Sequence, residues 1–400
     1  MSARRILLAD ADAFYVSVAR LVDPEGAGKA PLLIVGGTAE GRGVVTSASY
    51  EARRFGVTSA MPTARALRLC PGATVVPVPW EACVEKSHAI REVLGKYAPV
   101  VEAASQDECY LEMSGTERLY KDEPLADTAR RMREAVLAET QISVSIGGGT
   151  SKLIAKMAAT MAKPGGIHVV DAGGEQAFMR RFQLADLPFV GPRFQERLGR
   201  FNLKSVDEAL AAGADNLRAW LGDREGLWLW TRIHGEDEAR VERNGDNKSI
   251  SRDETFGVDI DDDDVLRGEL IKLVDRAASD LRESELLART VTVRLRDHDF
   301  VDRQASRTVE APVISDRAVL RVARELLLKL RRARPVPARL LGVGLSSLVR
   351  SDRPGQLSLI AEPQSETEKD RAVARVVDEL RRKLGDEAVA LGRAPTHRRR

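Results

Sequence analysis

Three acidic side chains carry the clearest chemical signal in this sequence. Asp10 follows the apolar run Ile6–Ala9, and Asp107 and Glu108 stand directly before the apolar run Cys109–Leu111. Carboxylates at the ends of buried strands are costly to desolvate unless a cation offsets their charge. Carboxylate oxygens are the ligands that Mg²⁺ prefers, and two such ions about 3.5–4 Å apart promote in-line displacement at phosphorus. The three acids therefore predict metal-dependent phosphoryl or nucleotidyl transfer.

The adjacency of Asp107 and Glu108 restricts where they can lie. Neighbouring residues of a strand point to opposite faces of its sheet. Both acids reach one site only if they lie at the turn before the strand, which the preceding Ser105 and Gln106 permit. Two adjacent acids are common on protein surfaces, so the pair alone is weak evidence for a metal site. A third acid, Asp10, at the end of another apolar strand strengthens that prediction.

Composition sets the class of protein and leaves the partner open. A chain of 400 residues predicts two to four domains, and 43% apolar with 30% charged residues is typical of soluble globular proteins. The net charge of +2 (62 basic minus 60 acidic residues) favours no particular partner. No apolar run approaches membrane-spanning length, and the residues before Asp10 are too few for a signal peptide, so we expect a cytoplasmic protein with no membrane partner. The scattered Cys70, Cys83 and Cys109 predict buried, reduced thiols and no zinc site.

The first 170 residues alternate strand and helix signals. The pattern predicts an antiparallel sheet with helices on one face, including a strand over Ile142–Ile146 that ends at Gly147–Gly149 and a helix over Leu153–Ala162. Residues 174–238 read as short helices, and the tryptophans there are expected to pack in a core, with base stacking as the alternative.

A second β-rich unit follows a polar linker. Alternation over Thr290–Arg296 places Val291, Val293 and Leu295 on one face and Arg294 and Arg296 on the other. From residue 289 to 350 there are 14 Lys and Arg against 6 Asp and Glu, a balance of +8. This segment therefore predicts a basic sheet face for a polyanion, with ordinary surface arginines as the alternative.

Several motifs in fixed order add a resemblance to these readings. They are Asp10–Tyr15, Ser49–Pro62, Gln106–Leu111, Ser143–Gly147, Ala155–Ala159, Met161–Gly166 and Leu340–Leu345. Together they resemble the signature of the Y-family DNA polymerases, of the DinB or DNA polymerase IV type, over residues 5–350. Dispersed motifs in one order are far more specific than any single one.

The resemblance implies an α+β multidomain fold shaped like a right hand. Residues 1–12 and 80–172 would form the palm, 13–79 small fingers, and 173–238 a helical thumb with a helix-hairpin-helix. Residues 239–247 would be a linker, 248–350 a little finger of β-sheet and two helices, and 351–400 a tail. The implied function is template-directed, low-fidelity translesion DNA synthesis on primer-template DNA with deoxynucleoside triphosphates. A monomer is expected.

Carried over to this sequence, the family's metal ligands are Asp10, Asp107, Glu108 and the carbonyl of Ala11. Two Mg²⁺ ions, which Mn²⁺ can replace, would activate the primer 3′ hydroxyl and bind the triphosphate. The other residues that the resemblance implicates in nucleotide binding are Phe14, Tyr15 as a steric gate against ribonucleotides, and Tyr50, Arg53 and Lys163 on the phosphates. Asp12 is expected to stabilise its loop or to bind metal weakly.

The DNA and clamp contacts rest on looser matches. Arg294 and Arg296 would face DNA, and Gly191 belongs to a thumb hairpin whose backbone N–H groups bind phosphate. Phe189 stands where the family usually has glycine, and Gln106 where it usually has an aliphatic residue. The segment 356–360 resembles a motif that binds the sliding clamp, through Gln356, Leu357, Leu359 and Ile360.

Two other functions stay open from the sequence. One is a catalytically weak or inactive relative that binds DNA and repair partners, which would be expected to have lost the three acids. The other is a different two-metal enzyme on a palm-like sheet, such as a nucleotide cyclase, which has no need of a thumb or a basic second domain.

Overall fold

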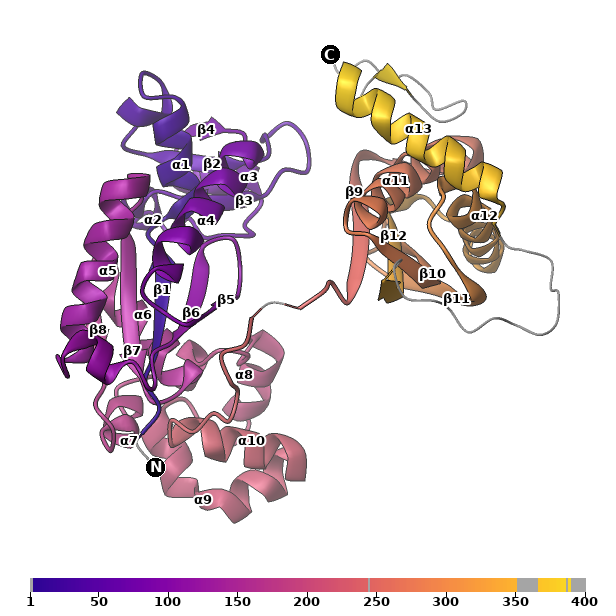
Figure 1. Cartoon of the computed structure of the whole chain (residues 1–400). Coiled ribbons are helices and arrows are strands. Elements are labelled where there is room, and N and C mark those ends of the chain that lie inside the picture. Colours follow the sequence, from indigo (N-terminus) through magenta and orange to yellow (C-terminus); the bar gives the residue numbers. More distant parts are fainter. Residues whose placement is uncertain (1–2, 244, 351–365, 386–387, 390–400) are drawn as a thin grey trace. The chain divides into compact units, whose positions relative to one another are not determined.

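The structure is a computed structural model that describes residues 3–243, 245–350, 366–385 and 388–389 (Figure 1). By its internal contacts the chain divides into two compact units, Met1–Asn244 and Gly245–Arg400. Each unit has its own sheet and core, and each is described separately below.

A five-stranded sheet forms the centre of the first unit. Its order is β5–β6–β1–β7–β8, and every neighbouring pair is antiparallel except β7 and β8. The strands are β1 (Ile6–Ala11), β5 (Val100–Ala103), β6 (Glu108–Glu112), β7 (Val144–Gly149) and β8 (Ile167–Val169). Because β1 is central and fully buried, residues at its end are enclosed by strands on both sides.

Helices cover both faces of this sheet, so the expectation of helices on one face is wrong. On one face α4 (Trp80–Gly95) and α5 (Leu125–Thr140) pack against Leu7, Ala9 and Ala11. On the other face Ala155 and Ala159 of α6 (Lys152–Ala162) pack with Ile6 and Leu8. The alternation of β1 places Asp10 on the α6 face.

The glycines at 147–149 belong to strand β7 and do not end it, which corrects the predicted boundary. A Cβ atom on Gly147 would lie 2.0 Å from the backbone nitrogen of Ala159 and 2.1 Å from the oxygen of Ala155. Only glycine permits this approach of strand and helix. The close packing sets the position of α6, and with it the lysines that α6 carries toward the acids.

A smaller three-stranded sheet lies beside the first within the same unit. It has the order β3–β2–β4, and it packs with α1 (Phe14–Val22), the helix that follows β1. The remaining elements here are the short helices α2 (Tyr50–Arg53), α3 (Thr63–Leu69) and η1 (Ala27–Lys29) and the strands β2 (Leu33–Gly36), β3 (Val45–Ala48) and β4 (Thr74–Val76).

Short helices complete the first unit. They are α7 (Glu175–Met179), η3 (Leu184–Asp186), α8 (Pro192–Gly199), α9 (Val206–Leu221) and α10 (Asp223–Ile233), with η2 (Glu117–Tyr120) nearer the sheet. Trp220, Trp228 and Trp230 pack against their shared core, as predicted. Val241, from the predicted linker, is buried on the β1–β6 sheet with Ile6 and Leu8. The first part of that segment is therefore fixed to this unit.

The second unit is a four-stranded antiparallel sheet covered by two helices. The order is β11–β10–β12–β9, with β9 (Ser249–Ile260), β10 (Leu286–Asp297), β11 (Asp302–Val313) and β12 (Ala338–Arg350). Helices α11 (Asp263–Glu283) and α12 (Asp316–Ala333) form the core with the sheet. Val291, Val293 and Leu295 are completely buried there, as the alternation predicts.

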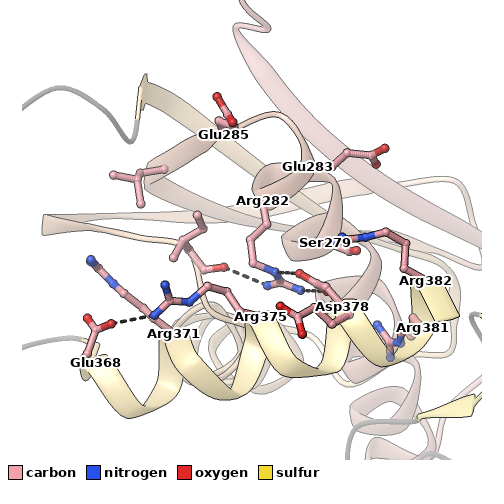
Figure 2. Close-up of a pocket in the computed structure, with 13 residues that line it drawn as sticks. Ser279, Arg282, Glu283, Glu285, Glu368, Arg371, Arg375, Asp378, Arg381 and Arg382 are labelled. Atoms are coloured by element: carbon pink, nitrogen blue, oxygen red, sulfur yellow. Dashed lines mark hydrogen bonds and ion pairs between the residues drawn. The ribbon is translucent and has the colours of Figure 1, made fainter.

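A third helix, α13 (Glu368–Leu384), is joined to this unit by several ion pairs (Figure 2). Arg282 of α11 binds Asp378 of α13 and also Asp316 of α12. Arg381 of α13 binds Asp275 with both terminal nitrogens. The groove between α11 and α13 has a volume of about 970 Å³. Five arginines and five acids line it, so it has no net charge to attract an anion.

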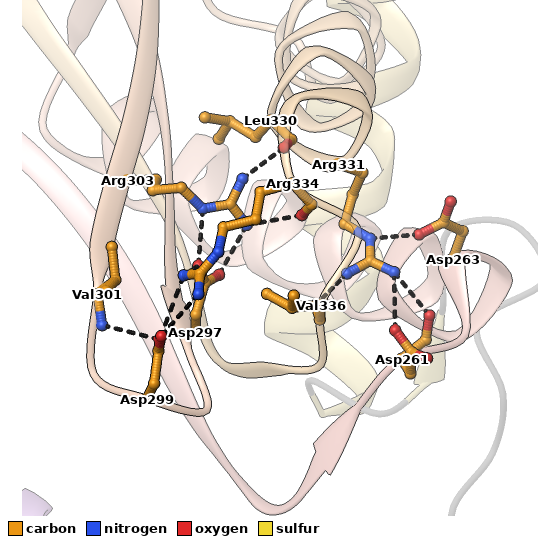
Figure 3. Close-up of polar contacts among 10 residues, drawn as sticks. All are labelled: Asp261, Asp263, Asp297, Asp299, Val301, Arg303, Leu330, Arg331, Arg334 and Val336. Atoms are coloured by element: carbon orange, nitrogen blue, oxygen red, sulfur yellow. Dashed lines mark hydrogen bonds and ion pairs between the residues drawn. The ribbon is translucent and has the colours of Figure 1, made fainter.

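Two further clusters of ion pairs fix the ends of the sheet and of α12 (Figure 3). Asp297 ends β10 with no exposed surface, and it accepts hydrogen bonds from Arg303 at 2.9 and 2.6 Å and from Arg334 at 2.6 Å. Arg331, near the end of α12, binds Asp263 at 2.6 Å and Asp261 at 3.1 Å. These contacts satisfy buried charges that would otherwise destabilise the unit.

Candidate active site

The two strands at the middle of the first sheet bring Asp10 and Glu108 together. Asp10 is the direct partner of Glu108 in the β1–β6 pairing, so both side chains lie on the face that α6 covers. The Ala11 N–H donates to the Asp107 carbonyl at 2.9 Å, which joins the ends of the two strands. Residues almost a hundred positions apart thus form one acidic site at the sheet edge.

Each of the paired acids holds a lysine from α6 or the loop after it. Lys163 Nζ lies 2.6 Å from Asp10 Oδ1, and Lys156 Nζ lies 2.6 and 2.7 Å from the two oxygens of Glu108. Burial raises the pKa of Asp10 to about 6, an effect that Lys163 opposes and the nearby Glu108 and Asp107 increase. The buried site therefore holds more negative charge than its two lysines neutralise.

Asp107 lies in the turn before β6, as expected, but Glu108 is already the first residue of the strand, which corrects the expectation that both acids belong to the turn. Strand β6 begins at Glu108, and Asp107 accepts a hydrogen bond from Ser105 Oγ at 2.5 Å. Gln106, one of the departures from the family pattern, is exposed in the same turn. Its side chain is therefore close in sequence to the acids without being buried among them.

The acids fit divalent cations by their chemistry. They are hard oxygen donors of the kind that divalent metal ions prefer. Two of them, Asp10 and Glu108, already bind the positively charged ammonium group of a lysine. Among the residues that the structure describes, no three His, Cys, Asp or Glu side chains are close enough together to ligate one metal ion. When bound, a divalent cation would take the place that the ammonium groups of Lys163 and Lys156 hold at Asp10 and Glu108.

Asp12, two residues beyond Asp10, is buried and fully hydrogen-bonded. It accepts hydrogen bonds from Ser143 Oγ at 2.6 Å, Ser145 Oγ at 2.7 Å and the Gly165 N–H at 2.9 Å. The Tyr50 hydroxyl donates to it at 3.4 Å. Its oxygens are therefore engaged with protein groups, which agrees with the loop-stabilising alternative for this residue.

The residues predicted to bind the nucleotide surround these acids. Arg53 lies with its guanidinium carbon 5.0 Å from the centre of the Tyr50 ring and donates from Nε to the Ala48 carbonyl at 2.9 Å. The pKa of Tyr50 is raised to about 12, first by burial and then by the charge of Asp12. Lys163, the third residue predicted to bind phosphate, contacts Asp10 of the acidic site.

The aromatic residues after Asp12 pack edge to face, with their rings nearly perpendicular. Phe14 is 1% exposed and belongs to the core. The Tyr15 ring makes edge contacts with Phe14 at 5.3 Å and with Trp80 at 6.0 Å between ring centres. Burial raises the pKa of Tyr15, and the charge of Asp107 adds to this effect. Tyr15 is therefore held beside the acids.

Sequence reasoning gave no role to Lys156 or Trp80. Lys156 belongs to the motif Ala155–Ala159 and lies four residues after Lys152, the first residue of α6. Residues four apart share one face of a helix, so Lys152 and Lys156 point the same way, and Lys156 reaches Glu108. Trp80 begins α4 and is 59% exposed. No pattern in the sequence pairs Trp80 with Tyr15, because the contact depends on how two helices pack.

The predicted DNA-contacting arginines of the second unit are both paired. Arg294 binds Asp253 at 3.0 Å, and Arg296 binds Asp302 at 2.8 Å. Gly342 makes room for the first pair, since a Cβ there would lie 1.7 Å from an Asp253 oxygen. Each of these two arginines on the open face of the sheet is thus paired with an aspartate, so they contribute less free positive charge than the sequence indicated.

The structure describes the predicted thumb hairpin, whereas the predicted clamp motif lies outside the described residues. Gly191 stands at the N-terminal end of α8 with extended backbone angles. Phe189, where glycine is usual, has a left-handed φ of +71° and is 87% exposed. The backbone keeps a conformation that favours glycine, at some cost in strain. Gln356, Leu357, Leu359 and Ile360 lie outside the described residues.

Comparison with known proteins assigns the family. The impB/mucB/samB family matches residues 9–160, and the C-terminal domain of the same family matches residues 247–359. The chain is 34% identical over 385 residues to a protein named DNA polymerase IV from Caulobacter vibrioides, covering 96% of this chain and 93% of that protein. It is 33% identical over 399 residues to one of the same name from Dehalococcoides mccartyi, covering 98% of each.

Solved structures give the same fold. A structure titled as a Y-family DNA polymerase chimera matches with a TM-score of 0.76 at 24% identity, over 86% of this chain and 99% of that one. DinB from Sulfolobus solfataricus matches with a TM-score of 0.58 at 24% identity, over 86% of this chain and 98% of that one. The fold is that of the right-handed Y-family polymerases.

The chain belongs to the impB/mucB/samB family. Within it, the chain is of the Y-family, DinB or DNA polymerase IV type. In the part of the chain that the structure describes, every helix is too short or too polar to span a lipid bilayer.

Proposed function

We propose that this chain is a DNA-directed DNA polymerase that adds deoxynucleotides to a primer 3′ end and carries out translesion synthesis. One observation carries the proposal: Asp10 and Glu108 face each other across two strands, each bound to a lysine, in a chain that belongs to the DNA polymerase IV type. Structures of related polymerases titled as ternary complexes support DNA and a nucleotide as its ligands.

The reacting groups are assigned to the acidic site of the first unit. Asp10, Asp107, Glu108 and the Ala11 carbonyl are the proposed ligands of two Mg²⁺ ions, which Mn²⁺ can replace. Bound there, these ions supply charge neutralisation at the phosphates and activation of the primer hydroxyl. With cations bound at these acids, the ammonium group of Lys156 would no longer be needed to neutralise Glu108, and that of Lys163 would be free to bind phosphate.

The triphosphate is assigned to Tyr50, Arg53 and Lys163, and the sugar to Tyr15. Arginine can bind two phosphate oxygens with its forked donors, and lysine adds a point charge. Tyr15, held from two sides by aromatic rings, leaves too little room for a 2′ hydroxyl. These roles rest on the motif match together with the closeness of the side chains to Asp10 and Asp12.

The proposed domains are a palm over 1–12 and 80–172, fingers over 13–79, a thumb over 173–238, a linker over 239–247 and a little finger over 248–350. Gly191 and the arginines Arg294 and Arg296 are the proposed DNA contacts. The segment from Gln356 to Ile360 is a proposed sliding-clamp tether. A monomer in the bacterial cytoplasm is proposed from the family alone.

DNA dependence of pyrophosphate release tests the class of reaction. The enzyme is incubated with Mg²⁺ and deoxynucleoside triphosphates, with and without a primed template. We expect release only with the template. Release without any DNA would indicate a cyclase, and no release with either Mg²⁺ or Mn²⁺ would indicate a non-catalytic relative.

A further inference from the structure

We infer that Asp12 is a positioning residue of the nucleotide site: it holds the loop of Lys163 and the helix of Tyr50 against the strand that carries Asp10. The inference rests on the proposed function, since it concerns the triphosphate of the same incoming nucleotide. Asp12 itself contacts neither the nucleotide nor a metal ion.

The position of Asp12 in the fold gives it this reach. It follows β1 directly, and its N–H donates to the Ser143 carbonyl at 2.9 Å while its carboxylate accepts from Ser143 Oγ. Ser145 Oγ, inside β7, donates to the other oxygen at 2.7 Å. The end of β1 is thereby joined side by side to β7 through both backbone and side chains.

The same carboxylate reaches the loop after α6. The Gly165 N–H donates to Asp12 Oδ2 at 2.9 Å, two residues after Lys163. Arg133 binds the Gly165 carbonyl from the other side. The loop is therefore fixed at Gly165 by two contacts, and Lys163 extends from it toward Asp10, 2.6 Å away.

The fourth contact joins the fingers to the palm. The Tyr50 hydroxyl lies 3.4 Å from Asp12 Oδ1, and Tyr50 in turn lies under Arg53. A phenol has one proton to donate, so Tyr50 can exchange Asp12 for a phosphate oxygen without moving its ring. Asp12 thus pre-organises phosphate-binding groups from two separate parts of the chain.

The alternative role, as a metal ligand, is a poor match to these contacts. Asp12 is 5% exposed, and both of its oxygens accept hydrogen bonds from neutral donors. A ligand for a cation would have to break several of them. Asp10 and Glu108, by contrast, already bind cationic groups.

Nucleotide titrations of primer extension test the inference, using Asp12→Ala and Asp12→Asn of the full chain. Asp12→Ala should raise KM for the nucleotide by about tenfold or more while changing kcat much less. Asp12→Asn should recover part of the loss, because its amide oxygen can keep the bonds from Ser143 and Gly165 while the Ser145 hydroxyl turns to accept its amide N–H. Inhibition by inorganic tripolyphosphate should weaken in proportion, since only the phosphates are affected.

A double substitution separates positioning from general damage. In a Lys163→Ala background, Asp12→Ala should raise KM less than it does in the unaltered protein, because one of the two groups that it positions is already gone. Asp23→Ala is the matched control: Asp23 ties a loop of the same unit by accepting from Gly26 and Ala27, and its loss should leave KM unchanged. Ser145→Ala, which removes one contact only, gives a milder variant if Asp12→Ala does not fold.

The outcomes are distinct. An unchanged KM in the Asp12 variants, fully additive effects with Lys163→Ala, or a shift in Mg²⁺ dependence alone would overturn the inference. Absence of extension by the unaltered protein would overturn the proposed function instead.

Discussion

Two buried aspartates at strand ends, one in each unit, have opposite surroundings. Asp10 is the second-to-last residue of β1, lies beside two further acids and holds one lysine at 2.6 Å. Asp297 ends β10 and is held by two arginines, one of them through both of its carboxylate oxygens. The first cluster has surplus negative charge and a single flexible partner for each paired acid. In the second, Arg303 and Arg334 balance the charges of Asp297 and Asp299, and the partners are planar, forked guanidinium groups (Figure 3).

This difference separates a site that can accept a cation from a cluster that only stabilises. An arginine fork that satisfies a buried carboxylate leaves nothing for an added ion to improve. A lysine can turn away, because its charge sits on a flexible stem. Both aspartates are buried, so burial alone does not distinguish a reactive site from a stabilising ion pair. The identity and the number of the partners make that distinction.

The largest expected effect comes from removing a carboxylate of the first cluster. Asp107→Ala should abolish primer extension and leave DNA binding largely intact, because the acid serves the reacting phosphate and not the duplex. The measurement is extension of a labelled primer together with its binding to the protein. Persistent extension would show that Asp107 is not part of the site and would break the comparison.

Substitution of Asp297 should have the opposite profile. Asp297→Ala leaves two arginines without their buried partner, a change that typically costs about 3–5 kcal/mol. The second unit should melt at a clearly lower temperature, whereas nucleotide-dependent chemistry in the first unit should survive at low temperature.

The control for that variant is Asp299→Ala, which removes an exposed partner of Arg334. It should change the melting temperature little, since exposed ion pairs contribute weakly. Equal melting of both variants would mean that the Asp297 cluster is not what stabilises this sheet.

Sugar selectivity should show a smaller, graded effect. Tyr15→Ala should increase ribonucleotide incorporation by removing the ring. Trp80→Ala should increase it less, by up to about tenfold, since an aromatic edge contact contributes about 0.5–1.5 kcal/mol. Competition between ribonucleotide and deoxynucleotide measures both, and Trp80→Phe is the matched control. Unchanged selectivity in Tyr15→Ala would refute the steric gate, and unchanged selectivity in Trp80→Ala alone would refute only its support.

The smallest effect is expected at the paired arginines of the second sheet. Arg294→Ala should reduce the salt dependence of DNA binding by no more than about one phosphate contact, because Asp253 already neutralises part of its charge. Asp253→Ala should strengthen binding by freeing Arg294. If Asp253→Ala instead weakens binding, this face of the sheet is not a DNA contact.

The sequence predicted much of this site because its elements have strong local signals. Apolar runs before Asp10 and after Glu108 indicated two strands, and the turn before Glu108 placed Asp107. The motif match supplied the partners of those acids, since several short segments in one order are rarely coincidental. These are the parts in which local pattern and tertiary structure agree.

The remaining features depend on packing, which one sequence does not encode locally. Gly147 read as the end of a strand, but it is an interior position that α6 approaches too closely for a side chain. Arg294 and Arg296 read as free charges, but Arg296 binds Asp302 of the neighbouring β11, and Arg294 reaches across β12 to Asp253 of β9. Only the strand register brings those charges together.

The most direct measurement compares two glutamates of one strand in template-directed extension. Glu108→Gln alters the acid opposite Asp10, and Glu112→Gln alters the acid four residues further along the same face, opposite Ile6. With Mg²⁺, a primed template and four deoxynucleotides, the unaltered chain and Glu112→Gln should add the nucleotide complementary to the template. Glu108→Gln should add almost none. Equal extension by both variants, or addition that ignores the template base, would contradict this account.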